Sequence, residues 1–357
     1  MSSISTPAVE TCSKRFAPFW VGSARAVALT FVLVAGAVYE AGHPSALLNA
    51  NVWMHLRSGL WMLQSHSVPH SGLFSQYGSL PWVDSSWVSD VVLASAYKLF
   101  GLRALPLMLM LVKVGLAIVT FLLARAGKAS FWSALALSAV AQYVIPLSQS
   151  LPYDLSVLLF AAVLLLLQRS RLAGTVRSLY WLPALFAVWA NVHALFLAGL
   201  ALLALYLVSM WLEGLLEKPA DGLLKGQPRQ PAVKPVLVVF ASCLLATSLN
   251  PYGYRIFSAA YRSLYSEAAF QYFAEMRAMS FRHIQDYALM LLVMTAFLAL
   301  GRRPSLRIFE LLVLIAGTLV AFRIQRESWM VVLPAITVFS GGFGFSQGNV
   351  EEEITVR

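Results

Sequence analysis

The sequence predicts an all-α protein in which residues 24–345 form one bundle of transmembrane helices. Hydrophobic residues make up 59% of the 357 residues and charged residues only 12%, about half the charged share of a typical soluble domain. The charge-free run from Ser178 to Leu212 alone exceeds the roughly 20 residues that cross a bilayer. These observations exclude a soluble enzyme and a disordered chain, and the presence of two cysteines excludes a disulfide scaffold.

Apolar windows predict about ten spanning helices. The polar break Asn191-Val192-His193 divides the long charge-free run into two of them. Residues 1–23 then form an N-terminal segment and residues 346–357 a polar C-terminal tail. The predicted spans lie near 24–42, 104–124, 130–147, 151–168, 179–193, 195–212, 235–250, 287–301, 306–322 and 328–345.

The basic residues predict the side of the membrane on which each connection lies. With the N-terminus in the cytoplasm, 16 of the 26 Lys and Arg residues fall in inner segments and nine in the much longer outer segments. Such an excess is typical of the cytoplasmic side. We therefore expect a multi-pass protein with a cytoplasmic N-terminus, whose basic excess serves topology and the lipid bilayer, with no nucleic acid as a partner.

Two long external loops follow from this layout, at 43–103 and 251–286. Residues 47–64 predict a helix in the bilayer interface, with Trp53 on its apolar face and both Asn51 and His55 on its polar face. Residues 87–101 are apolar enough for a short span. Counting them as a span would move basic turns to the outside, so we predict a second interfacial helix there. The linker 217–234 is typical of a plain connector.

Acidic and histidine side chains near the outer face are the first candidates for a site, because boundary acids need partners or water. Asp154 enters a span after a very short outer turn, where it is either a metal or substrate contact or an ordinary helix cap. His55 is either a proton-transfer group or an exposed interfacial histidine. Asp84 and Asp90 flank the start of the second interfacial helix. The histidines of this loop do not have the spacing of a zinc site.

Four basic side chains are expected at the outer face, in a topology that otherwise keeps cations inside. They are candidates for binding the phosphate of a lipid-linked substrate, and the alternative is contact with ordinary phospholipid head groups. Within the membrane, we expect Lys113 and Glu310 to form a structural pair. The four outer residues are Arg282, His283, Arg323 and Arg326.

Four motifs, in order, carry a resemblance to a known family. They are NVWMHLRSGLWMLQSHSVPHSGLFS, PWVDSSWVSDVVLASAYKLFGLRAL, WANVHALFLAGL and LNPYGYRIF, between about residues 47 and 330. They resemble motifs of bacterial GT-C-type, polyprenyl-phosphate-dependent membrane glycosyltransferases, which typically read Asp-x-Trp-Trp-His-Leu and then Pro-Trp-Val-x-x-x-Trp-Leu.

The resemblance implies transfer of a sugar from a polyprenyl-phosphate carrier to a glycan, lipid or protein acceptor at the outer face of the bacterial inner membrane. It implies a base or metal contact near residue 51 and a divalent cation, Mg or Mn, at Asp154. Asn51 replaces the family's acid, so Asp84 becomes the first choice for the base and Asp90 the second. Asn51, Trp53 and Asp90 are then expected substrate contacts, beside the four basic residues.

Two other functions remain open at this stage. Ser85 and Ser86 replace residues that are often His and Glu in the family, so the chain is alternatively an inactive homologue that assists envelope-glycan assembly. A transporter or flippase of a lipid-linked substrate is the third hypothesis. It would require paired charges within the membrane and an internal repeat, and the sequence contains no visible repeat.

Overall fold

The computed structural model describes residues 10–72, 76, 78–145, 150–216, 231–264, 270–271, 273–303 and 307–342. Outside these ranges lie residues 1–9, residues 217–230 of the predicted linker 217–234, and the tail 346–357. The described residues form helices and no β-sheet, with one isolated antiparallel bridge between Ser71 and Pro81. The predicted all-α class is therefore confirmed.

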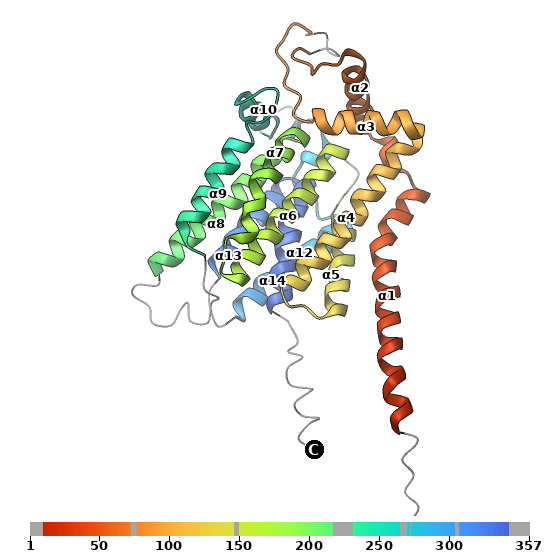
Figure 1. Ribbon diagram of the computed structural model, residues 1–357, viewed down its shortest axis with the longest axis vertical. Helices are drawn as coiled ribbons and strands as arrows, with labels where there is room; N and C mark the ends of the chain where they lie inside the picture. Colours follow the sequence, from red (N-terminus) through yellow and green to blue (C-terminus); the bar gives the residue numbers. More distant parts are fainter. Residues whose placement is uncertain are drawn as a thin grey trace, which may run out of the picture.

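Helices occupy all ten of the predicted windows, and most of them stand side by side in one bundle (Figure 1). Five stretches are long and apolar enough to cross a bilayer: Gly22–Gly42 within α1, Trp87–Ala126, α6, α8 and α12. The other helices are shorter; α7 has 11 residues, about 16 Å of helix. The count of about ten spans thus stays a prediction. The ten helices are α1 (Glu10–Gly42), α4 (Ala104–Ala126), α5 (Phe131–Val144), α6 (Leu151–Ala173), α7 (Leu182–Val192), α8 (Phe196–Leu216), α9 (Val233–Ala246), α12 (Ile284–Gly301), α13 (Ile308–Arg323) and α14 (Trp329–Gly342).

The loop predicted at 43–103 contains two helices at one end of the bundle, α2 (Ala50–Ser65) and α3 (Trp87–Phe100). Gly101 ends α3 with a positive φ of 60°, which glycine adopts without strain. The chain then turns through η2 (Gly101–Arg103) into α4, so that α3 lies across the bundle while α4 runs along it (Figure 1). This direction fits the predicted interfacial helix. We call this end of the bundle the α3 end.

The loop predicted at 251–286 begins with a short helix, α10 (Arg255–Leu264), at the α3 end (Figure 1). The remaining turns are 3-10 helices that connect the longer elements. They are η1 (Ser45–Leu48), η3 (Arg177–Trp181), η4 (Ala274–Met276) and η5 (Gln325–Ser328).

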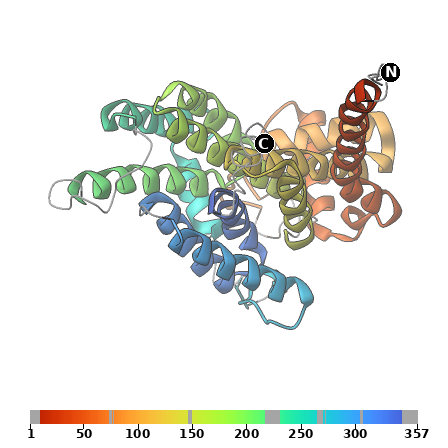
Figure 2. The same cartoon turned by 90° about the horizontal axis from the view of Figure 1, so that it is seen from below.

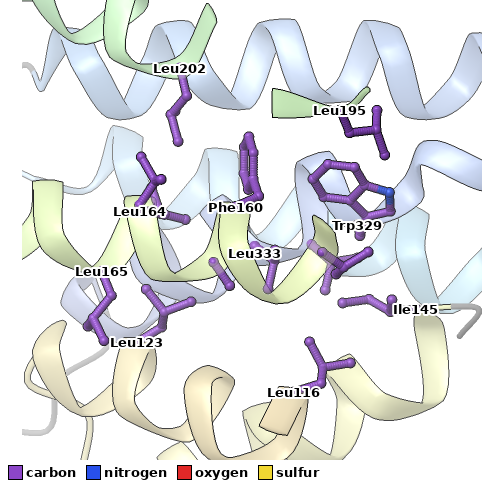
Figure 3. Close-up of a cluster of buried hydrophobic side chains, with 14 of the residues drawn as sticks. Leu116, Leu123, Ile145, Phe160, Leu164, Leu165, Leu195, Leu202, Trp329 and Leu333 are labelled. Carbon is purple, nitrogen blue, oxygen red and sulfur yellow. The ribbon is translucent and has the colours of Figure 1, made fainter. Parts of the chain in front are cut away.

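Apolar side chains from α4, α6, α8 and α14 meet along the middle of the bundle (Figure 3). Trp329 of α14 and Phe160 of α6 pack edge to face, with ring centroids 4.9 Å apart. Both rings are buried, and Trp329 is the larger. Burial of such aromatic side chains is a major favourable term in folding. This packing therefore holds the helices in place relative to one another, and with them the turns at the α3 end.

α1 stands at the side of the bundle against α4 and α5 (Figures 1 and 2). Its outward face exposes Val27 and Phe31, each by 70%, as expected for a surface in contact with lipid. Lys113 of α4 binds the buried carboxylate of Glu40 on α1 at 2.8 Å. The predicted pair of Lys113 with Glu310 is wrong, because Lys113 faces α1 whereas Glu310 lies in the first turn of α13 among arginines.

Candidate functional site

Helices α2 and α3 are packed closely enough that their backbones nearly touch. A Cβ atom at Gly59 of α2 would lie 1.9 Å from the carbonyl oxygen of Asp90, so only glycine fits at this position. The buried face of α2 consists of Val52, Leu56 and Met62, with Gly59 between the last two. This close approach brings side chains of α2 into direct contact with the first turn of α3.

His55 lies within this contact, where its Nδ1 atom is 2.8 Å from Oδ1 of Asp90. The His55 side chain is 14% exposed and the Asp90 side chain 1%. His55, on the predicted polar face of α2, is thus in contact with α3. Trp53, on the predicted apolar face, is 42% exposed and donates from Nε1 to the carbonyl of Leu47.

His55 and Asp90 both have pKa values above their ordinary values in water. Burial raises the pKa of Asp90 to about 7. Burial alone would lower the pKa of His55, but the hydrogen bond that His55 donates to Asp90 and the charges of Asp90 and Asp84 outweigh it, so the pKa of His55 is raised. Two groups coupled at this distance titrate as one unit. The pair therefore retains a proton near neutral pH and can exchange it there.

Asp84 lies beside the pair, three residues before the start of α3 at Trp87. Its Oδ1 accepts a hydrogen bond from the backbone N–H of Ser86 at 2.9 Å. Burial raises the pKa of Asp84. The two predicted base candidates, Asp84 and Asp90, thus both lie close enough to His55 to act on its charge.

The turn between α7 and α8 supports the same end of the bundle. The predicted break at residues 191–193 is confirmed, since α7 ends at Val192 and α8 begins at Phe196. Trp87 of α3 donates to Asn191 at 2.8 Å, and Ser89 of α3 donates to the carbonyl of Val192 at 2.8 Å. These bonds hold α3 against the end of the bundle.

His193, in this turn, connects the His55 region with a second group of polar residues. Burial lowers its pKa to about 3, and the charges of His55 and Arg326 contribute to this shift. Its ring packs edge to face on Tyr153, with centroids 5.9 Å apart. His193 is therefore a neutral imidazole between two charged regions.

The second group consists of Tyr153, Arg326, Glu327 and Trp329. The Tyr153 hydroxyl accepts from Trp329 Nε1 at 2.7 Å and lies 3.1 Å from Glu327 Oε2 and 2.9 Å from the carbonyl of Arg326. The Arg326 guanidinium lies over the Tyr153 ring, 4.7 Å from its centroid, and Arg326 Nε donates to Glu327 at 3.2 Å. Burial raises the pKa of Glu327. This group places one cation near the His55 region.

Asp154 is buried in the first turn of α6, where its backbone N–H donates to Ser150 at 2.9 Å. It lines a small cavity with Val52 of α2 and Leu93 of α3, whose other walls are mainly apolar. Mg²⁺ and Mn²⁺ require several oxygen ligands. Among the described residues, no group of three or more His, Cys, Asp or Glu side chains is placed to hold a metal ion. Because Mg²⁺ is often held by one or two carboxylates together with substrate phosphates, the divalent cation at Asp154 stays a prediction.

Of the four predicted phosphate contacts, the structure brings only Arg326 into the site. Arg282 and Arg323 are exposed, and Arg323 lies over the ring of Phe270 at 6.0 Å. His283 is exposed and caps α12, with its backbone N–H donating to Asp286 at 3.3 Å. It lines a separate surface cleft with Gln325. These three side chains are therefore exposed, whereas Arg326 is packed against Tyr153.

The two long loops predicted at 43–103 and 251–286 meet beside the site. Tyr252, within the motif LNPYGYRIF, donates its hydroxyl proton to the carbonyl of Pro69 at 2.8 Å. Asn51 is half-buried at the start of α2, and its backbone N–H donates to the Asn49 side chain at 2.9 Å. No sequence pattern indicated Tyr153, His193 or Trp329 as site residues. His193 lies within a motif that was identified, but no local spacing indicated its contacts with distant helices.

No protein-family model matches the chain, and no curated protein matches it by sequence. The likeness to GT-C enzymes therefore remains an interpretation of four sequence motifs. The geometry itself defines a helical protein with a buried His-Asp pair at the α3 end, adjacent to an Arg-Glu-Tyr group.

Proposed function

We propose that the chain is a GT-C-like membrane transferase that moves a sugar from a polyprenyl-phosphate carrier to an acceptor hydroxyl at the α3 end. The acceptor is a glycan, a lipid or a protein. The observation that carries the proposal is the 2.8 Å contact between His55 Nδ1 and Asp90 Oδ1. A histidine oriented by a buried carboxylate is a common general base.

In this mechanism His55 is the catalytic base and Asp90 a positioning residue. His55 is the more exposed partner, so its other nitrogen, Nε2, takes the proton of the acceptor hydroxyl. The hydroxyl oxygen attacks the anomeric carbon, and the bond from that carbon to the carrier phosphate breaks, leaving its electron pair on the phosphate. Asp90 keeps the imidazole oriented, and the charges of Asp90 and Asp84 stabilise the imidazolium that forms.

This assignment accounts for Asn51, where the family's motif carries an acid. An amide cannot take a proton at neutral pH, but His55 lies one helical turn further along α2. The charge on the departing phosphate needs a cation. Of the four basic candidates, Arg326 is the one connected with the pair, because its charge and that of His55 both act on His193. No step in this mechanism uses a metal ion.

The placement in the bilayer is part of the proposal. Five stretches have the length and composition of spans. The distribution of basic residues supports a cytoplasmic N-terminus, with the α3 end at the outer face of the inner membrane.

Turnover of a polyprenyl-phosphate sugar by the purified full chain tests the proposal. We expect His55→Gln to reduce the rate at least about 100-fold, the usual contribution of a general base. His43→Gln is the matched control, because His43 is an exposed histidine that stacks on Tyr39. Asp90→Asn should move the pH-rate profile to lower pH, since His55 loses the partner that raises its pKa. Full rates in both His55→Gln and Asp84→Asn would refute the proposal.

A non-catalytic partner of glycan assembly is the second candidate. Asn51, which stands where the family's motif carries an acid, favours it. In that case the wild-type chain would bind the carrier, but it would not turn it over with any acceptor, and His55→Gln would bind equally well.

A further inference from the structure

Three arginines surround one carboxylate at the end of the bundle opposite to α3. Arg171 lies in the last turn of α6, Arg303 follows α12, and Arg307 precedes α13, whose first turn carries Glu310. Arg171 Nη1 and Arg307 Nη1 are each 3.5 Å from Glu310 Oε1, and Arg303 binds Glu310 Oε2. We call Arg171, Arg303 and Arg307 the arginine cluster.

The charges of this cluster do not balance. Arg171 and Arg303 are each 8% exposed, Arg307 is 25% exposed and Glu310 14%. Glu213 of α8 is a further buried acid near the cluster. Its charge and the charge of Arg171 both reach the Tyr206 hydroxyl. Even with Glu213 included, three cations face two carboxylates among the described residues. A charge removed from water without a counter-charge is unfavourable, so the cluster calls for an additional anion.

The arginines also retain hydrogen-bonding capacity. Their Nε atoms are buried and have no hydrogen-bond partner within the described residues. The Arg171 guanidinium lies 5.1 Å from the centroid of the Phe309 ring, and Arg303 Nη2 donates to the carbonyl of Val338. Aromatic and backbone contacts thus hold the guanidinium groups in place without supplying negative charge.

We propose that the arginine cluster binds a phosphate group. Arginine presents two parallel N–H donors that match phosphate oxygens, and its charge persists at every physiological pH. The phosphate belongs either to the head group of an acidic lipid or to a soluble phosphate. The site lies at the far end of the bundle from His55, so this proposal does not depend on the proposed transferase activity.

Calorimetric titration of the full chain in neutral detergent tests the proposal. The probes are dihexanoyl phosphatidic acid, inorganic phosphate and, as a neutral reference, dihexanoyl phosphatidylcholine. We expect Arg307→Gln to weaken binding of the phosphate probe at least about tenfold, as loss of a charge-assisted hydrogen bond would. Glu310→Gln should strengthen it, because the competing carboxylate is removed.

Arg169→Gln is the matched control, an exposed arginine two residues before Arg171 on the same helix. Binding of phosphatidic acid alone would identify a lipid head group, and binding of inorganic phosphate as well would identify a soluble ligand. If Arg307→Gln does not fold, Arg307→Lys decides, since it keeps the charge and loses the paired donors. Failure of both phosphate probes to bind, or equal losses in Arg169→Gln and Arg307→Gln, would overturn the proposal.

Discussion

The two ends of the bundle bury charge in opposite ways. At the α3 end the buried groups are mainly His55, Asp84, Asp90 and Glu327, all of which can lose their charge by binding or releasing a proton. At the other end they are arginines, whose charge is permanent, gathered on Glu310. A proton therefore suffices to neutralise excess charge at the first end, whereas the second requires a bound anion. The first end is suited to proton transfer and the second to anion binding.

The largest effect that separates the ends is expected from Gly59→Ala. The added Cβ atom would lie 1.9 Å from the Asp90 carbonyl oxygen, so α2 must move away from α3 and the His55–Asp90 contact is lost. Such overpacking should reduce the free energy of unfolding by about 3 kcal/mol. Thermal unfolding in detergent measures this loss, and phosphate affinity at the arginine cluster should not change.

The control is Gly214→Ala on α8, where nothing lies within 4 Å of an added Cβ. Alanine is the better helix former, so this variant should gain up to about 1 kcal/mol. If Gly59→Ala proves as stable as Gly214→Ala, α2 and α3 are not in the close contact described. If it also weakens phosphate binding, the two ends are coupled.

Sequence patterns were sufficient to predict the helices. Each of the ten apolar windows contains a helix, and the polar break at residues 191–193 gave the turn between α7 and α8. The uneven distribution of Lys and Arg between the two sides was the reason for not counting residues 87–101 as a span. The direction of α3, which lies across the bundle, agrees with that choice (Figure 1). These features depend on local composition and period, which one sequence records directly.

The partners within the site could not be predicted in this way. His55 and Asp90 are 35 residues apart, and Tyr153 and Glu327 are 174 residues apart. Such pairs form because helices pack, and packing directions are not encoded in any local pattern. For the same reason Lys113 was assigned the wrong acid.

An effect of intermediate size is expected from Tyr153→Phe. The hydroxyl accepts from Trp329 and lies within hydrogen-bonding distance of Glu327, so its removal leaves a buried donor and a buried carboxyl group with fewer partners. The loss should be about 2 kcal/mol of unfolding free energy, measured by chemical unfolding in detergent. Tyr143→Phe is the control, because Tyr143 is 52% exposed. Equal stability of both variants would show that the Tyr153 hydroxyl contributes nothing.

The smallest effect is the dependence of stability on pH. The pKa of Asp90 is about 7 in the folded chain and about 3.9 when unfolded, so stability falls as pH rises between these values. His55, with its raised pKa, contributes stability below about pH 6.5 that is lost as pH rises through its folded pKa. His193 acts in the opposite direction, but only between about pH 3 and about pH 6.5.

Above about pH 6.5 only the groups with raised pKa values remain, so the wild-type free energy of unfolding should fall from pH 6.5 to pH 8, by at most about 1.4 kcal/mol per pH unit for each proton. Asp90→Asn should flatten this slope, because it removes the carboxyl group and lowers the pKa of His55. His43→Gln should keep the wild-type slope, since His43 is exposed. A wild-type slope in Asp90→Asn would mean that the α3 end does not hold the proton, and the contrast with the arginine cluster would then rest on the arginines alone.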